Sequence, residues 1–251
     1  MSDDTDEFFD KKKFKEIAAH WDHAHRYSPG PRHRRKIILN MLKELHFSDC
    51  IDTGCAQPYL LQEIKRRFQV KGYGCDISTT VIKENKEKAP DCEFKVLDLE
   101  KEKWPNDRQF DLVISSEVIE HIADWEAAVK NIASMAKRYL LITVPSGKIR
   151  KIDRTVGHYR HYLGNELISH IENQGFRCLR SFHHGFPMHS LYKRLINNFA
   201  PDKIYASFQG GGEYTFLQKM FSQIIYITFY LNYLFSKGTQ LFVLAERQNN
   251  E

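Results

Sequence analysis

The sequence predicts an α/β protein with a Rossmann-like, doubly wound sheet of seven strands and an aromatic insertion before the last strand. Short apolar runs of strand length alternate with amphipathic runs of helix length from residue 49 onward. Four successive predicted strands end in a polar residue, at Asp52, Asp76, Asp98 and Ser115. A chain of 251 residues is long enough for one such domain with an insertion.

Residues 1–48 precede the first strand and are predicted to form a tail and two helices. The acidic start, Met1–Asp10, is expected to be disordered or frayed. A helical pattern begins at Phe14 and breaks at the Ser-Pro-Gly-Pro run of residues 28–31. A second helix is predicted over Arg32–Leu45.

The stretch Asp49–Leu61, DCIDTGCAQPYLL, predicts the first strand, a glycine turn at Gly54 and a helix that starts near Pro58. In a parallel sheet such a turn lies at the carboxyl edge, where backbone N–H groups and the helix N-terminus face the polar end of a ligand. We expect that ligand to carry a carboxylate or a ribose. Asp76 follows the second strand, Val70–Cys75, at a position suited to accept hydrogen bonds from ribose hydroxyls.

The remaining elements of the core follow in alternation. The sequence predicts a helix over Thr79–Lys88 with Ser78 as its N-cap. Further helices are predicted over Ala123–Ala136 and Asn165–Asn173. The remaining strands are predicted over Cys92–Leu97, Phe110–Ser115, Tyr139–Val144, Gly175–Phe182 and Gly238–Arg247. The polar, basic segment Ser146–Gly164 is longer than a connection needs and is interpreted as a substrate loop. The core is thus expected to span residues 49–182 and 238–251.

The insertion, residues 183–237, is rich in aromatic side chains and has a predicted hinge at Gly210–Gly212. Its second half, Met220–Ser236, contains no charged residue. Its polar residues, and the need for the chain to return to the sheet, argue against a membrane span. It is interpreted as an apolar helix that covers the substrate pocket, pairs two subunits or rests on a membrane surface, with the first two favoured.

Composition sets broad limits on the partners and the compartment. The net charge of +5 and the pI of about 8.8 fit acidic or phosphorylated substrates, but an ordinary solvated surface explains them better. The five cysteines form no CxxC pair and are expected to be reduced core residues. Together with the lack of an apolar N-terminal segment, they predict a cytoplasmic protein.

The four polar strand ends, with helices between them, resemble class I S-adenosylmethionine-dependent methyltransferases across most of the chain. The segment HWDHAHRYSPGPRHRRKIIL is similar to the entry segment of ubiquinone-pathway O-methyltransferases, and GHYRHY resembles an element of small-molecule and glycan methyltransferases. The resemblance implies S-adenosylmethionine as cofactor. It implies cofactor contacts from Asp52, Gly54, Cys55, Ala56, Asp76, Ile77, Asp98, Leu99, Ser115 and Glu117.

Within this resemblance, the glycine turn holds the methionine part, Asp76 the ribose and Asp98 the adenine amine. It also implies that the N-terminal helices form a lid, in which Trp21, Tyr27, Arg34 and Arg35 either touch the ligands or serve packing and solvation.

The first loop departs from the family pattern D-x-G-x-G-x-G, because Ala56 and Pro58 stand where the family has glycines. Alanine disfavours a positive φ, and proline lacks an N–H but suits the first turn of a helix. An altered loop is therefore expected. The missing glycines leave open the alternative of a non-catalytic, methyltransferase-like binding module.

Methyl transfer requires alignment of a nucleophile, and a hydroxyl acceptor also needs a general base. His121 is the first candidate and His158 the second, with His161 on the same loop; the alternative role for His121 is to cap or pack the next helix. No metal ligand is assigned. The E-x-x-E-H spacing of Glu117, Glu120 and His121 nevertheless resembles the metal site of small-RNA 2′-O-methyltransferases, with a loop histidine completing it.

The insertion lacks a sustained interleaving of basic and aromatic residues, which argues against a nucleic-acid partner. The leading hypothesis is therefore a methyltransferase that acts on a small molecule or glycan, at oxygen. Metal-dependent RNA 2′-O-methylation is the alternative enzyme activity, and a homodimer is one way to cover the apolar helix.

Overall fold

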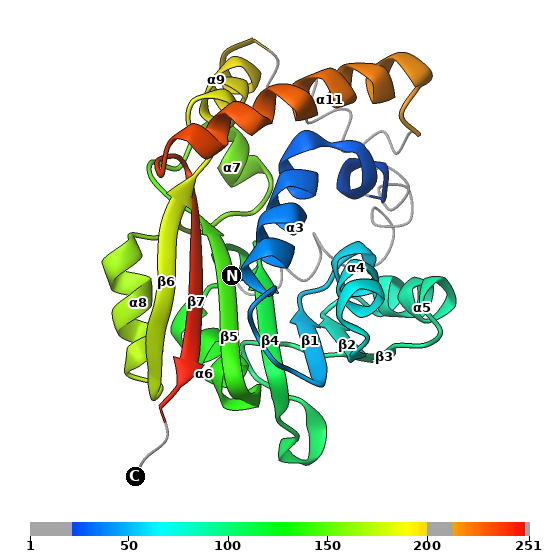
Figure 1. Ribbon diagram of the computed structural model, residues 1–251, viewed down its shortest axis with the longest axis vertical. Coiled ribbons are helices and arrows are strands. Elements are labelled where there is room, and N and C mark those ends of the chain that lie inside the picture. The colour runs from blue at the N-terminus through cyan, green and yellow to red at the C-terminus, as the bar shows by residue number, and fades with distance from the viewer. Residues whose placement is uncertain (1–21, 200–212, 249–251) are drawn as a thin grey trace. The chain divides into compact units, whose positions relative to one another are not determined.

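The computed structural model describes residues 22–199 and 213–248, and the chain divides into two compact units (Figure 1). The sheet unit comprises Glu44–Ile149, His158–His183 and Gln240–Glu251, and the helical unit comprises Met1–Lys43, Arg150–Gly157 and His184–Thr239. Each unit is built from three separate stretches of the chain. Trp21, Met1–Asp10 and Gly210–Gly212 lie outside the described residues.

The sheet unit contains one sheet of seven strands in the order β3-β2-β1-β4-β5-β7-β6. The strands are β1 (Asp49–Thr53), β2 (Lys71–Asp76), β3 (Glu93–Val96), β4 (Phe110–Ser116), β5 (Ala136–Pro145), β6 (Phe176–His184) and β7 (Gln240–Arg247). β1 pairs with β2 and β4 in parallel, whereas β7 runs antiparallel to β5. The predicted Rossmann-like fold class is confirmed.

Four helices accompany the strands. They are α4 (Tyr59–Phe68), α5 (Thr79–Lys88), α6 (Trp125–Met135) and α8 (Gly164–Glu172), with short 3₁₀ turns η1 (Pro105–Asp107) and η2 (Ile119–His121). α5 begins where predicted, since the hydroxyl of Ser78 accepts from the N–H of Val81 at 3.3 Å. Asp124 caps α6 in the same way through the N–H of Ala127, at 3.0 Å.

The core of the sheet unit lies between the sheet and α6 with α8. Its strands contribute alternate residues, Ile51, Val113, Ile142 and Val243, all fully buried. β4 and β5 are buried over nearly their whole length, as expected of central strands covered on both faces. This packing fixes the carboxyl ends of β1, β2 and β4 relative to one another.

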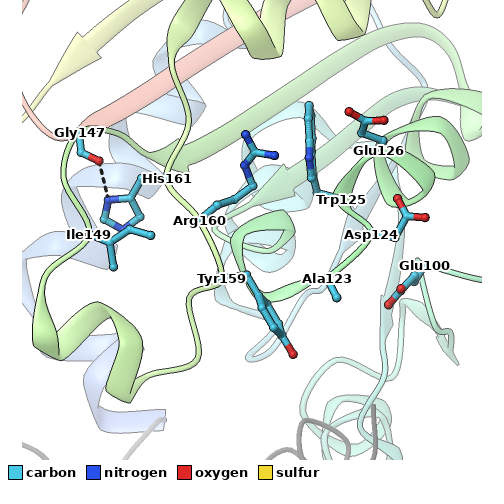
Figure 2. A pocket seen from close by; sticks show the side chains of 10 residues that line it. All are labelled: Glu100, Ala123, Asp124, Trp125, Glu126, Gly147, Ile149, Tyr159, Arg160 and His161. Carbon is cyan, nitrogen blue, oxygen red and sulfur yellow. Dashed lines mark hydrogen bonds between the residues drawn. The ribbon is translucent and has the colours of Figure 1, made fainter. Parts of the chain in front are cut away.

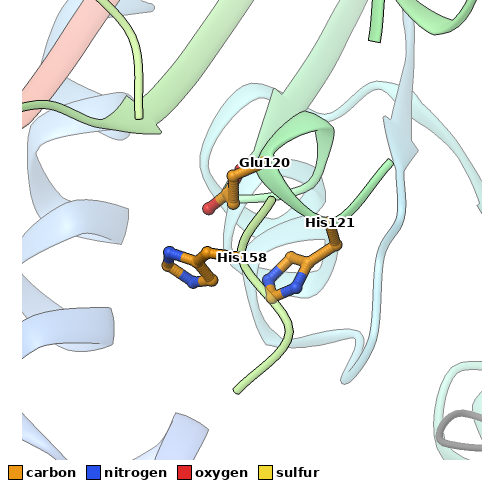
Figure 3. A group of neighbouring side chains, drawn as sticks. All are labelled: Glu120, His121 and His158. Carbon is orange, nitrogen blue, oxygen red and sulfur yellow. The ribbon is translucent and has the colours of Figure 1, made fainter. Parts of the chain in front are cut away.

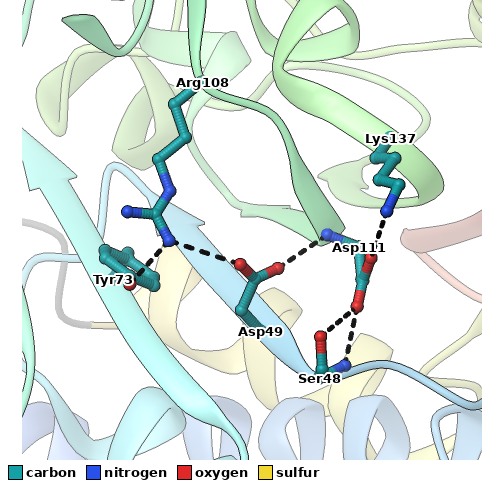
Figure 4. A network of polar contacts seen from close by, with 6 residues as sticks. All are labelled: Ser48, Asp49, Tyr73, Arg108, Asp111 and Lys137. Atoms are coloured by element: carbon teal, nitrogen blue, oxygen red, sulfur yellow. Dashed lines mark hydrogen bonds and ion pairs between the residues drawn. The ribbon is translucent and has the colours of Figure 1, made fainter.

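A network of polar contacts closes the opposite, amino edge of the sheet (Figure 4). Asp49 accepts from the N–H of Asp111 at 2.8 Å and pairs with Arg108, which also donates to the hydroxyl of Tyr73 at 2.6 Å. Burial opposes the charge on Asp111, but hydrogen bonds from Ser48 outweigh it and lower the pKa of this carboxyl. These carboxylates therefore join β1 to β4, far along the strands from the predicted ligand edge.

The helical unit contains α3 (Pro29–Met41), α7 (Lys151–Thr155), α9 (Met188–Phe199), α11 (Phe216–Thr228) and the 3₁₀ helix η3 (Phe229–Leu234). Residues 22–27 are also helical. Within the described ranges, no helix combines the length and apolarity needed to cross a bilayer.

Most element boundaries differ from the prediction by one to three residues, and two differences have a structural reason. α3 begins at Pro29 instead of Arg32, because prolines are compatible with the first turn of a helix, where the N–H has no partner in the helix. The segment Ser146–Gly164, predicted as a loop, contains the short helix α7.

Candidate active site

The loop between β1 and α4 turns sharply at Gly54, where φ is +67°. A Cβ atom here would lie 2.5 Å from Cγ2 of Val118, so glycine alone suits both the backbone conformation and the space. Val118 follows Glu117, which itself has a φ of +59° and donates its N–H to the carbonyl of Thr143 at 2.8 Å. The turns after β1 and β4 therefore touch at the carboxyl edge of the sheet.

Ala56 adopts the left-handed conformation that its Cβ disfavours, with a φ of +41°. Hydrogen bonds on both sides of the residue hold it there. Its N–H donates to Oδ2 of Asp76 at 3.0 Å, and its carbonyl accepts from the amide of Asn85 at 2.7 Å. Pro58 directly precedes Tyr59, the first residue of α4, and its carbonyl accepts the N–H of Gln62 at 2.9 Å. The loop thus keeps a glycine-like turn without the glycine.

Asp76 ends β2 and is held by backbone N–H groups on both carboxylate oxygens. Oδ2 accepts from Ala56, and Oδ1 accepts from the N–H of Ser78 at 3.0 Å. Burial raises the pKa of Asp76, and these hydrogen bonds oppose the shift by stabilising the carboxylate. The next side chain, Ile77, is apolar yet 43% exposed. The end of β2 thus presents a positioned acid beside an exposed apolar surface.

The side chains of Asp52, Cys55 and Ser115 are buried at the ends of β1 and β4. The hydroxyl of Ser115 has no hydrogen-bond partner among the described residues. Cys55 donates its N–H to the carbonyl of Cys75 at 2.9 Å, and burial raises the pKa of its thiol well above the usual value. A protonated, buried thiol is a packing group here, and the N–H of Cys55 is already bonded to the end of β2.

Asp98 lies two residues beyond the end of β3. Its carboxylate accepts from the N–H of Glu100 at 3.1 Å and pairs with Nζ of Lys101 at 2.8 Å. The side chain of Leu99 is buried in the core of the sheet unit. Asp98 is therefore available to a ligand through a partly exposed carboxylate, and Leu99 through its backbone.

A carboxylate and two imidazoles meet just beyond β4 (Figure 3). Glu120 is fully buried, His121 and His158 are partly buried, and one ligand atom of each lies within 4.8 Å of the others. The rings of His121 and His158 stand perpendicular, with centroids 4.7 Å apart. Two loops are joined here, because the N–H of Tyr159 donates to the carbonyl of Glu120 at 2.8 Å.

The second histidine of the loop supports the first. Nδ1 of His158 lies 3.1 Å from Nε2 of His161, whose Nδ1 lies 3.2 Å from the carbonyl of Gly147. The structure thus brings the predicted residues His121 and His158 together and adds His161 behind them. The same arrangement can orient a proton acceptor or, with Glu120, ligate a cation.

A pocket of about 770 Å³ opens beside this cluster in the sheet unit (Figure 2). Its acidic side chains are Glu100, Asp124 and Glu126, and its other lining residues include Trp125, Tyr159, Arg160 and His161. The guanidinium of Arg160 lies 4.7 Å from the centroid of the Trp125 ring and donates to Glu166 at 2.5 Å. The buried Nε of Arg160 has no hydrogen-bond partner among the described residues.

Trp125 and Arg160 were not among the site residues that the sequence predicted. Arg160 lies inside the GHYRHY segment, between the two histidines, and this basic, aromatic pattern was the available signal. Trp125 reads as a core residue in the pattern of α6, and burial of its side chain agrees with that reading. Its contact with Arg160 joins residues 35 positions apart in the chain, which periodicity does not reveal.

The matches to known proteins agree with the arrangement of strands. A family model described as "Methyltransferase domain" matches residues 14–192. No curated protein matches the sequence significantly.

Several solved structures share the fold at low sequence identity. Magnesium protoporphyrin IX methyltransferase from Synechocystis, solved with bound SAH, is 16% identical, with a TM-score of 0.54 over 86% of this chain and 83% of that one. Phosphoethanolamine N-methyltransferase 2 of Haemonchus contortus, in complex with S-adenosyl-L-methionine, is 17% identical, with a TM-score of 0.62 over 98% of this chain and 60% of that one. A chain from a complex of the Haloferax volcanii Trm112 methyltransferase activator with a methyltransferase is 15% identical, with a TM-score of 0.64 over 95% and 97%.

Proposed function

Because this chain belongs to the methyltransferase domain family and its cofactor is S-adenosylmethionine, we propose that it methylates an oxygen atom of a small molecule or glycan. The main supporting observation is the convergence, at one edge of the sheet, of the Gly54 loop, the carboxylate of Asp76 and the histidines His121 and His158. Ligands of open α/β sheets bind at the carboxyl ends of the strands.

We assign the cofactor contacts to four strand ends, those of β1, β2, β3 and β4. Asp52 and the turn formed by Gly54, Cys55 and Ala56 would enclose the methionine part, with Ser115 and Glu117 beside it. Asp76 would accept hydrogen bonds from the ribose, since its carboxylate is already oriented by two N–H groups. The exposed side chain of Ile77 would pack on the adenine, and Asp98 and Leu99 would receive the adenine amine.

The chemistry places few demands on the protein. Bound S-adenosylmethionine supplies a methyl group on a sulfonium, and displacement at that methyl requires an aligned acceptor. His121 would accept the proton of an acceptor hydroxyl at a ring nitrogen, and His158 would orient the His121 ring through their edge contact. The pocket that contains Arg160 and three carboxylates would bind the rest of the acceptor.

Arg160 gives this pocket a preference for ligands that carry an anionic group. Its guanidinium lies against Trp125 and pairs with Glu166 through one nitrogen, and its side chain is 34% exposed. A guanidinium recognises a carboxylate or phosphate in plane, whereas the acidic wall suits hydroxyl groups and cations. An acceptor that carries both an anionic group and hydroxyls fits these residues.

A second candidate is metal-assisted methyl transfer, as in RNA 2′-O-methylation. It is favoured by the cluster of Glu120, His121 and His158, whose atoms lie close enough to ligate one cation. In that case the histidines would hold the cation, and the cation would orient the acceptor hydroxyl. Dialysis against a chelator separates the two candidates: retained turnover supports the histidine base, and loss that Mg²⁺ or Mn²⁺ restores supports the metal.

The proposal is tested by titration calorimetry with S-adenosylmethionine and by turnover with candidate acceptors. We expect micromolar affinity for the cofactor; no heat at millimolar cofactor, with the fold intact, would favour a non-catalytic binding module. His121→Ala should lower kcat by roughly 10²-fold while cofactor affinity stays unchanged. The matched control is His46→Ala, which changes an exposed histidine near the opposite end of β1. This variant should retain full turnover. Equal rates in both variants would remove His121 from the chemistry.

We also place the enzyme in the cytoplasm. All five cysteines carry free thiols, three of them buried in the sheet unit. Buried, unpaired thiols persist where the redox environment is reducing.

A further inference from the structure

The helices α11 and η3 expose a continuous row of apolar side chains. α11 contains 13 residues, none of them buried. The apolar stripe consists of Leu217, Phe221, Ile224, Ile227, Leu231 and Leu234, with exposed fractions between 48% and 71%. Their spacing of three or four residues places them on one side of the helix. An exposed row of this length is far more than scattered surface residues on an ordinary protein.

The opposite side of α11 makes the contacts that attach it to α3. Arg32 donates to the side chain of Gln223 at 2.9 Å, and Nε2 of His33 donates to the carbonyl of Tyr226 at 2.8 Å. Nζ of Lys36 donates to the hydroxyl of Tyr230 at 2.5 Å. Because these polar and aromatic groups hold the helix in place, the apolar stripe is left over for a partner.

The helical unit that carries the apolar stripe is rich in positive charge. No residue from Met220 to Ser236 is charged, and lysines flank this stretch at Lys219 and Lys237. The described residues of the helical unit include thirteen arginines and lysines against three acids, a difference of +10, whereas the whole chain has a net charge of +5. A partner that suits this surface is therefore both apolar and negatively charged.

We propose that the helical unit binds the surface of a bilayer that contains anionic lipids, with the apolar stripe inserted at the boundary of headgroups and acyl chains. An in-plane helix with an apolar face, few acids and basic neighbours has the properties of an interfacial membrane helix. The lysines and arginines would interact with anionic headgroups, each adding to the attraction.

A second copy of the chain fits the surface less well. Pairing two identical stripes about a twofold axis would bring two units with a charge excess of +10 together, and like charges oppose such an interface. An anionic bilayer instead places negatively charged headgroups directly beside its apolar acyl chains. The two occupants are distinguished by experiment.

The test is flotation of the full chain with vesicles of neutral phosphatidylcholine and of the same lipid with about 30% phosphatidylglycerol. We expect binding to the anionic vesicles that weakens with salt, because exposed charges are screened. The double variant Phe221→Glu, Ile224→Glu should lower the partition coefficient by roughly tenfold or more. The charge-reversal variant Lys219→Glu, Lys237→Glu should lose the preference for anionic lipid.

The matched control is Leu179→Glu, which introduces the same charge at an exposed leucine of β6 in the sheet unit. It should bind vesicles within about twofold of the parent chain. Circular dichroism and the affinity for S-adenosylmethionine check that each variant is folded. Absence of vesicle binding by the parent chain, or equal binding by the stripe variant, would overturn the proposal. A dimer in sedimentation that the stripe variant dissociates, without vesicle binding, would assign the stripe to a second copy.

Discussion

The sheet unit and the helical unit are stabilised in different ways. In the sheet unit, β4, β5 and β7 are buried almost throughout, and the described residues carry nineteen basic against twenty-one acidic side chains. In the helical unit, α11 buries none of its residues, and His33 lies among the rings of Tyr226, Phe229 and Tyr230. The sheet unit depends on apolar packing, whereas the helical unit adds aromatic and polar contacts around buried histidines to the buried apolar side of α3.

The two kinds of stabilisation suit two different tasks, holding a cofactor and presenting a surface to a partner. Cofactor geometry depends on strand ends whose positions a close-packed core fixes. Recognition of a partner depends on exposed groups, which leaves less apolar area to stabilise the unit that presents them. We therefore expect the two units to respond differently to pH and to substitution.

The largest expected difference between the two units is in how their stability depends on pH. Burial lowers the pKa of His33 to about 4, and burial together with the nearby charge of His33 lowers that of His184 to about 4. Between pH 6.5 and 4 the unfolded chain binds more protons at these sites than the folded chain, so stability falls as pH falls through this window. At pH 5 the loss is about 2 kcal/mol for each histidine.

Hydrogen exchange measured at pH 7.5 and pH 5 tests this expectation. After correction for intrinsic rates, amides of α3 should lose protection at the lower pH, while amides of β4 and β5 should not. Simultaneous loss in both units would mean that they unfold as one and do not differ in their response to pH. A His33→Gln variant should be less sensitive to pH than the parent chain.

The next effect concerns the cofactor edge of the sheet unit. Asp76→Ala should weaken S-adenosylmethionine binding by roughly 100-fold, or about 3 kcal/mol, because in the proposed assignment it removes a charged acceptor for two ribose hydroxyls. Calorimetry measures the affinity, and the thermal midpoint checks the fold. Asp107→Ala, at an exposed acid of the same unit, should bind normally. An unchanged affinity in Asp76→Ala would place the ribose elsewhere.

The smallest effects concern two neighbouring positions in the first loop. Gly54→Ala should destabilise the protein by about 2 kcal/mol, since the new methyl group meets Val118 and alanine disfavours a positive φ. Ala56→Gly should stabilise it by about 0.5 kcal/mol, because glycine relieves strain at a φ of +41° but gains freedom in the unfolded chain.

Thermal and urea unfolding measure both changes. Val118→Ala should partly rescue Gly54→Ala, and this double variant distinguishes the contact from backbone strain. If Gly54→Ala proves neutral, the turn after β1 is less tightly packed than the structure indicates.

The order and type of the core elements could be predicted from the sequence because they depend on local patterns. The helix Thr79–Lys88 and its cap at Ser78 match the structure, and the strand predicted over Phe110–Ser115 extends by one residue. The conformation of Ala56 could not be predicted, since it depends on hydrogen bonds to Asp76 and from Asn85, which are distant in sequence. The conformational preference of alanine alone predicts a negative φ at this position.

The candidate site could be predicted only in part from local sequence patterns. Polar residues at strand ends are brought to one edge by any parallel sheet, so Asp52, Asp76 and Ser115 could be named in advance. The contact between Val118 and Gly54 depends on how closely two turns approach, and the stacking of Arg160 on Trp125 depends on how a long loop packs. The exposed side of α11 was equally inaccessible, because an uncharged segment does not reveal which face its neighbours cover.

The order of strands has a consequence for synthesis of the chain. β7 lies between β5 and β6, so β6 emerges from the ribosome before the strand that separates it from the rest of the sheet exists. Until residues 240–247 have been translated, the nascent chain exposes the free edge of β5, which is a surface prone to non-native pairing. Completion of the sheet is therefore a late, long-range event, and substitutions in β7 should reduce the yield of folded protein during expression more than their distance from the cofactor edge suggests.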